Sequence, residues 1–195
     1  MLSEHLNTGQ TRRKLTEVKS LRSVTSLLGI IGLLALGVIA FPQTAGAQEH
    51  SYTSPKVDYT IDLPSPTWKL TDEPDEVHQH TEFIYGDRND GYLRIRKEAL
   101  DQGLTVREFA RRDQDQKTRY LPGYVDGKEE PFSGRLSGMT LSYEFTERGK
   151  PMAGRTYYLQ GDSSTVYVLR FTGMRDKLLR LRNQTDLIAR SLRLK

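Results

Sequence analysis

Hydrophobic and polar residues alternate along several segments of the chain beyond residue 50. Val57, Tyr59, Ile61 and Leu63 occupy every second position, which predicts a half-buried strand. The same alternation runs through residues 139–145, where apolar side chains face one way and polar side chains the other. Shorter apolar segments predict further strands at residues 81–85, 92–96, 156–160 and 165–171, with turns expected at residues 86–91, 126–127, 148–151 and 161–163.

Two segments have the spacing of helices. Thr105 and Glu108 form a capping box, which predicts a helix from there to about Lys117. After residue 174 the apolar spacing changes to three and four, which predicts an amphipathic helix ending the chain. The stripe of that helix consists of Leu178, Leu181, Thr185, Ile188 and Leu192.

The order of these elements is strands, a helix, more strands and a final helix. This order predicts an α+β fold in which helices pack on an antiparallel sheet. Residues 56–195 are expected to form a single domain, and the polar residues 48–55 a flexible lead-in.

Two segments resemble a known family. The segment YTIDLPSPTWKL and the ending YVLRFTG…LIARSLRL resemble the first strand and the C-terminal helix of the PsbP-like superfamily, which includes DcrB-like envelope proteins. The residues that carry the resemblance are Tyr59, Pro64, Trp68, Phe171 and Ser191. The resemblance implies an α/β/α sandwich, a central antiparallel sheet flanked by helices, that binds other proteins and is generally not catalytic.

An apolar run without charges precedes these segments. It spans 15 residues, Leu27 to Phe41, with basic residues before it and Ala45-Gly46-Ala47 after it. This order predicts a secretory signal peptide at residues 1–47, cleaved after Ala47. The alternative is an uncleaved anchor, although a 15-residue helix spans only about 22 Å of a hydrocarbon core about 30 Å thick. Both readings predict an exported protein, either periplasmic or secreted, or tethered to the outer face of the membrane.

Charge and composition exclude several classes of function. The chain has 29 Lys and Arg against 25 Asp and Glu, but residues 1–47 hold five of the bases and two of the acids. The remainder is nearly neutral, so we expect no nucleic-acid partner. The absence of cysteine excludes a cysteine nucleophile, thiolate metal sites and a lipidated cysteine.

The densest polar cluster contains Glu76, His78, His80 and Glu82. In an extended chain these four side chains share one face, where two imidazoles and two carboxylates suit Zn²⁺, Mn²⁺ or Cu²⁺. The alternative function is therefore a metal-binding protein or a metal-dependent hydrolase. The competing interpretation of the cluster is a solvated loop that leads into a strand.

The last predicted helix carries basic and apolar residues outside its stripe. Arg180, Leu187 and Arg190 represent this face, which suits a protein interface or an anionic membrane surface. The competing interpretation is an ordinary solvated helix face. No motif indicates a catalytic residue or a cofactor, so the sequence favours an exported, non-catalytic binding or assembly module whose partner is an envelope protein or a membrane surface.

Overall fold

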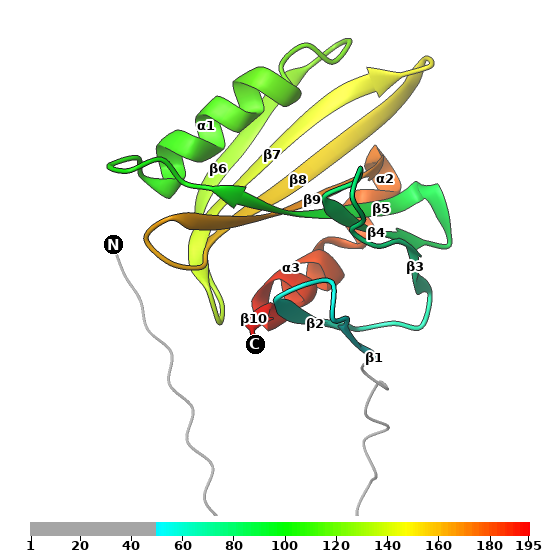
Figure 1. Cartoon of the computed structure of the whole chain (residues 1–195). Helices are drawn as coiled ribbons and strands as arrows, with labels where there is room; N and C mark the ends of the chain where they lie inside the picture. Colours follow the sequence, from blue (N-terminus) through cyan, green and yellow to red (C-terminus); the bar gives the residue numbers. More distant parts are fainter. Residues whose placement is uncertain (1–49) are drawn as a thin grey trace, which may run out of the picture. The chain divides into compact units, whose positions relative to one another are not determined.

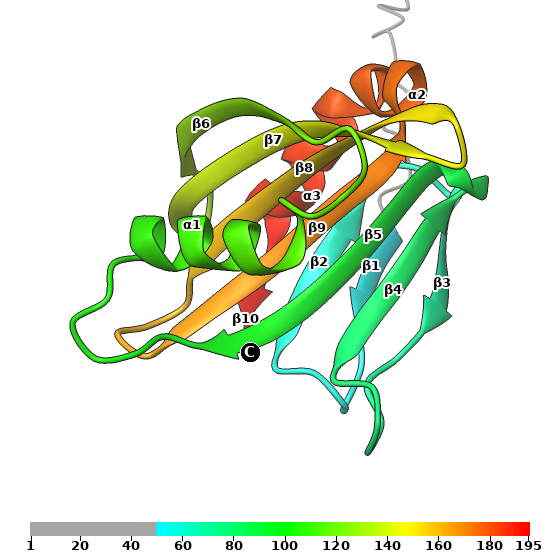
Figure 2. The same cartoon turned by 90° about the horizontal axis from the view of Figure 1, so that it is seen from above.

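The computed structural model describes residues 50–195, and the signal segment expected at residues 1–47 lies outside them. Seven strands form the main sheet, and each pairs antiparallel with its neighbours (Figures 1 and 2). In spatial order they are β3 (Trp68–Asp72), β4 (His80–Tyr85), β5 (Asp87–Ala99), β9 (Thr165–Met174), β8 (Lys150–Gln160), β7 (Ser137–Glu147) and β6 (Val125–Ser133).

A second, smaller sheet joins the two ends of the described chain. It consists of β1 (His50–Thr53), β2 (Tyr59–Leu63) and β10 (Arg193–Leu194), with β2 in the middle. Tyr59, Ile61 and Leu63 are buried, which confirms the predicted alternation. The flexible lead-in expected at residues 48–55 is wrong for residues 50–53, because each of these four residues is the register partner of a residue in β2.

Helices cover both faces of the main sheet, so the predicted α+β sandwich is confirmed (Figure 2). On one face, α1 (Val106–Lys117) packs against β7 and β8. On the other face lie α2 (Arg175–Arg180) and α3 (Arg182–Ser191), and α3 also packs on β2. Among residues 50–195, no helix is long and apolar enough to cross a lipid bilayer.

Three expected boundaries differ from the structure. Gly86 alone makes the turn after β4, with a φ of 68° that glycine adopts readily, and residues 87–91 continue as extended chain. The turn expected at residues 126–127 lies inside β6, where the register shifts between Asp126 and Glu129. The single final helix is in fact two helices separated at Leu181, followed by β10.

The predicted apolar stripe nevertheless faces the core throughout. Leu178, Leu181, Thr185, Ile188 and Leu192 are all buried. Two hydrogen bonds fix this layer: the indole Nε1 of Trp68 donates to Gln184 Oε1 at 3.0 Å, and the backbone N–H of Asp62 donates to Ser191 Oγ at 2.8 Å. Trp68 and Ser191, which carry the family resemblance, therefore have structural roles.

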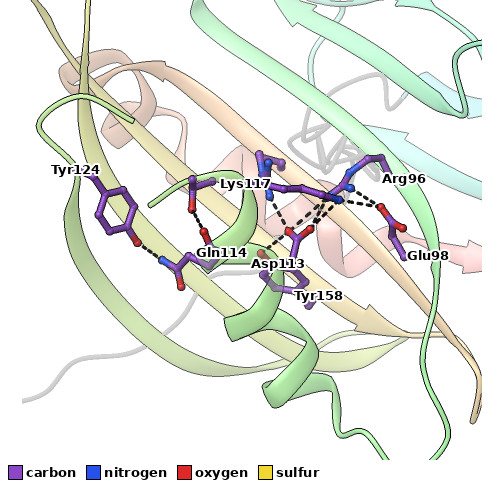
Figure 3. Close-up of polar contacts among 9 residues, drawn as sticks. Arg96, Glu98, Asp113, Gln114, Lys117, Tyr124 and Tyr158 are labelled. Carbon is purple, nitrogen blue, oxygen red and sulfur yellow. Dashed lines mark hydrogen bonds and ion pairs between the residues drawn. The ribbon is translucent and has the colours of Figure 1, made fainter. Parts of the chain in front are cut away.

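On the opposite face, a buried carboxylate holds α1 to the sheet (Figure 3). The capping box of Thr105 and Glu108 is present, which confirms the predicted start of the helix. One turn before its end, Asp113 accepts hydrogen bonds from Arg170 at 2.7 Å and from the Tyr158 hydroxyl at 3.0 Å. Arg96 and Lys117 form further ion pairs with it, at 3.2 and 2.9 Å.

Burial by itself raises the pKa of Asp113, but the three cations around it lower the pKa by more. The net result is a pKa below the ordinary value of 3.8. Asp113 is therefore ionised at neutral pH and ties together the helix, β5, β8 and β9.

Replacing Leu181 by Asp should unfold the protein. The variant places an unpaired carboxylate in the buried stripe, which costs several kcal/mol against a typical domain stability of about 5–15 kcal/mol. Thermal melting followed by circular dichroism measures the effect. Arg180→Asp, at the exposed neighbouring position, is the control and should melt close to the parent. If Leu181→Asp melts like the parent, α2 and α3 are not docked on the sheet.

Replacing Asp113 by Asn should lower stability at neutral pH by about 3–5 kcal/mol, because three cations lose their buried partner. A carboxyl whose pKa is depressed by folding stabilises the protein above its unfolded pKa, and this contribution disappears as the pH falls through the folded pKa. Urea unfolding at several pH values between about 7 and 3 should therefore show a weaker acid dependence in the variant. Asp115→Asn, an exposed change on the same helix, should keep the dependence of the parent. An unchanged acid dependence in Asp113→Asn would contradict this role.

Candidate functional site

Strands β3 and β4 bring three potential metal ligands together. His80 and Glu82 lie two residues apart on β4, and their Nε2 and Oε1 atoms are 3.0 Å apart. Asp72 is the register partner of Glu82 on β3. One ligand atom from each of the three side chains lies within 4.8 Å of the others, which is close enough for one divalent ion.

Glu82 is already engaged by cations. Its Oε1 atom accepts hydrogen bonds from Arg94 Nη2 at 2.8 Å and from the Tyr92 hydroxyl, and its Oε2 atom lies 3.8 Å from Arg88. Burial raises the pKa of Glu82, but the hydrogen bond from Tyr92 and the contacts with Arg94 together lower it by more. The pKa of Glu82 is therefore below its ordinary value. Burial and the same hydrogen bond raise the pKa of Tyr92 to about 12. A metal ion would therefore compete with Arg94 for the same oxygen.

The other two residues of the predicted cluster lie in the exposed loop between β3 and β4. The backbone N–H of His78 donates to Asp75 Oδ1, which organises this loop, and the His78 ring centre is 5.7 Å from that of His80. Glu76 is exposed in the same loop and is not part of the three-residue group. Asp72 was missed because it comes from the preceding strand, and only the strand register reveals its position.

The α2–α3 face presents the basic and apolar residues that the sequence indicates. Leu179 and Leu187 are 62% and 53% exposed. The side chain of Arg180 is exposed and forms no hydrogen bond or ion pair within residues 50–195. Arg190 is partly engaged, because its Nη1 atom donates to the Ser133 carbonyl and its guanidinium lies over the Phe132 ring.

A hollow of about 230 Å³ adjoins this face, between α2 and the strands β6, β7 and β8. Leu178 and Leu179 line its helix side, and the small residues Ala153 and Gly154 line its sheet side. Its rim is mostly basic and includes Arg155, Arg175, Arg182 and Lys128, with Glu130 and Glu144 between them. The shape and lining suit an apolar side chain with acidic neighbours. No local pattern in the sequence indicates this hollow, because it forms where strands and a helix distant in sequence meet.

Comparison of the whole chain with known proteins gives matches in structure only. No family model matches the sequence, and no curated protein matches it. Several solved structures share the architecture at low sequence identity, and three of them are described next.

LpqN of Mycobacterium tuberculosis, described as involved in cell envelope biogenesis, is 19% identical with a TM-score of 0.53, over 76% of this chain and 91% of that one. The cyanobacterial PsbP of Synechocystis is 13% identical with a TM-score of 0.54, over 81% of this chain and 99% of that one. The Ran-binding protein Mog1p of Saccharomyces cerevisiae is 8% identical with a TM-score of 0.56, over 76% and 96%.

Identities this low show the fold alone. The similarity to all three proteins confirms, at the level of fold, the resemblance that Tyr59, Trp68 and Ser191 indicate. The described part of the chain therefore has the PsbP-like fold.

Proposed function

We propose that the protein is an exported, non-catalytic binding module that docks another envelope protein on its α2–α3 face. The observation that carries the proposal is the exposure of Leu179 and Leu187 on helices whose opposite side is fixed in the core. Rigidly held apolar side chains among arginines are typical of the centre of a protein interface.

The charge of this face describes the partner. Residues 175–195 carry seven basic and two acidic side chains. Arg175 and Arg182 stand at the rim of the hollow beside Leu179. A complementary partner presents an apolar side chain for the hollow and carboxylates for the surrounding arginines.

The resolved pKa shifts of the carboxyl groups give no support for a carboxyl group that acts as a general acid. A carboxyl that acts as a general acid near neutral pH needs a raised pKa. Within residues 50–195, the carboxyl groups with a resolved pKa shift are all shifted downward: Asp58, Glu73, Asp75, Glu82, Glu108, Asp113 and Asp162.

The proposed location rests on the sequence before the described residues. The basic segment, the apolar run Leu27–Phe41 and the tripeptide ending at Ala47 have the order of a secretory signal. One protein with the same fold, LpqN, adds support for this location, since it is described as involved in cell envelope biogenesis. Mog1p, described as Ran-binding, supports the binding role and not the location.

Photo-crosslinking tests the docking face directly. A photoreactive amino acid replaces Leu187 in the exported protein, and the crosslinked partner is identified by mass spectrometry. Arg180→Glu with Leu179→Ser should abolish the crosslink without changing the melting curve, because both side chains point to solvent. His78→Ala with His80→Ala is the control and should leave the crosslink intact. Loss of the crosslink in the histidine variant alone would contradict the proposed face.

Metal binding is the second candidate function, and the close approach of Asp72, His80 and Glu82 is the observation that favours it. We expect protein purified without a histidine tag to carry less than one ion per chain, because Arg94 occupies Glu82. Arg94→Ala should then raise the affinity for Zn²⁺, as measured by calorimetry. One tightly bound ion per parent chain, lost in His80→Ala and retained in His50→Ala, would establish the metal function instead.

A further inference from the structure

A second and larger hollow, of about 680 Å³, lies on the α1 side of the main sheet. Helix α1 packs on the part of this face formed by residues such as Met139, Leu141 and Val168. Beyond the helix, Tyr143, Phe145 and Met152 form an apolar floor, which is itself largely buried because Leu121, Tyr124 and Met174 pack against it. The end of α1, the start of β5 and the β7–β8 turn supply the walls. We call this hollow the basic groove.

The lining of the basic groove is strongly positive. It contains six cationic side chains and one carboxylate, Glu147. The cations are Arg88, Arg94, Lys117, Arg148, Lys150 and Arg170. Behind the lining, Glu82 pairs with Arg88 and Arg94, Asp113 pairs with Lys117, Arg170 and Arg96, and Glu98 pairs with Lys117 and Arg96. With Glu147 included, four carboxylates therefore face seven cations, which leaves an excess of three positive charges.

Two of these cations lie directly opposite each other on neighbouring strands. Arg94 on β5 and Arg170 on β9 are direct register partners, and like charges in opposite positions destabilise a strand pair. Each has its carboxylate on the outer side, Glu82 on β4 and Asp113 on α1. The Nε atom of Arg170 is buried and has no hydrogen-bond partner within residues 50–195. At least one hydrogen-bond donor of the groove, Arg170 Nε, is therefore not satisfied by the acceptors around it.

The β7–β8 turn adds two uncompensated cations at the rim. Arg148 has a φ of 51° and is the only non-glycine residue within residues 50–195 with a positive φ. Together with Gly149, it provides the two positive φ values that a tight hairpin turn requires, a role in which Asn-Gly is favoured. The side chains of Arg148 and Lys150 are exposed and form no ion pair or hydrogen bond within residues 50–195. The turn thus holds two free cations over the apolar floor.

We propose that the basic groove binds a small amphiphilic anion, whose phosphate or carboxylate contacts the cations while its apolar body lies on Tyr143, Phe145 and Met152. A hollow of this volume falls within the range of about 300–1,000 Å³ typical of small-molecule sites. Its concave shape and apolar floor favour a small ligand over a flat membrane surface. The groove lies on the opposite side of the sheet from α2 and α3, so this site is independent of the proposed docking face.

Fluorescence titration with 1-naphthyl phosphate tests the proposal. 1-Naphthol, inorganic phosphate and dodecyl phosphate below its micelle concentration are the comparison ligands. The naphthyl and dodecyl phosphates should bind about tenfold or more tightly than either naphthol or inorganic phosphate, because only they match both the cations and the floor. 1-Naphthoic acid distinguishes a carboxylate preference from a phosphate preference.

The test variant is Arg148→Asn with Lys150→Gln, which removes both free charges and keeps a residue suited to the turn. It should bind 1-naphthyl phosphate about tenfold more weakly and melt like the parent. Lys69→Gln with Arg180→Gln removes two exposed charges outside the groove and should bind like the parent. The proposal is overturned if naphthol binds as tightly as its phosphate or if the two double variants behave alike. Binding only to phosphatidylglycerol vesicles, with no soluble phosphate bound, would assign the groove to a membrane surface instead.

Discussion

Burial of the α2–α3 stripe against the main sheet is the interaction on which the rest of the structure depends. Ile188 and Leu192 pack into the same core as Tyr157 and Phe171 of the central strands. Through Ser191 and Trp68, this layer also fixes β2 and β3, which lie more than a hundred residues earlier in the sequence. The outward side chains of α2 and α3 are consequently held on a rigid support, as a docking surface requires.

The two faces of the sheet differ in how they are held together. The α2–α3 face is stabilised mainly by apolar packing, whereas the α1 face combines a smaller apolar cluster with the buried carboxylate of Asp113. Because α1 covers only part of its face, cations on β5 and β9 remain beside a hollow whose apolar floor is covered in part by Leu121 and Tyr124. The same short helix thus stabilises one part of the sheet and leaves room for the basic groove beside it.

Local patterns in the sequence predicted the elements better than their connections. The capping box at Thr105 located α1, and the spacing of Leu178 to Leu192 located the buried side of the last helices. Strand β6 was missed because its charged, mostly exposed residues have no alternation, as suits an edge strand. Likewise, Asp113 lies far in sequence from Arg170, and Asp72 meets Glu82 only through the strand register. Such contacts depend on topology, which local spacing does not encode.

The pairing of β2 with β10 has a consequence for the order of folding. Strand β2 and residues 193–195 are neighbours, and the backbone N–H of Lys195 donates to the carbonyl of Asp58, just before β2. A growing chain that still lacks residues 175–195 has neither the third strand of the small sheet nor the helices that cover the core. The native core can therefore close only after residues 175–195 have been added to the chain, so the segment made before them stays without its helical cover until then.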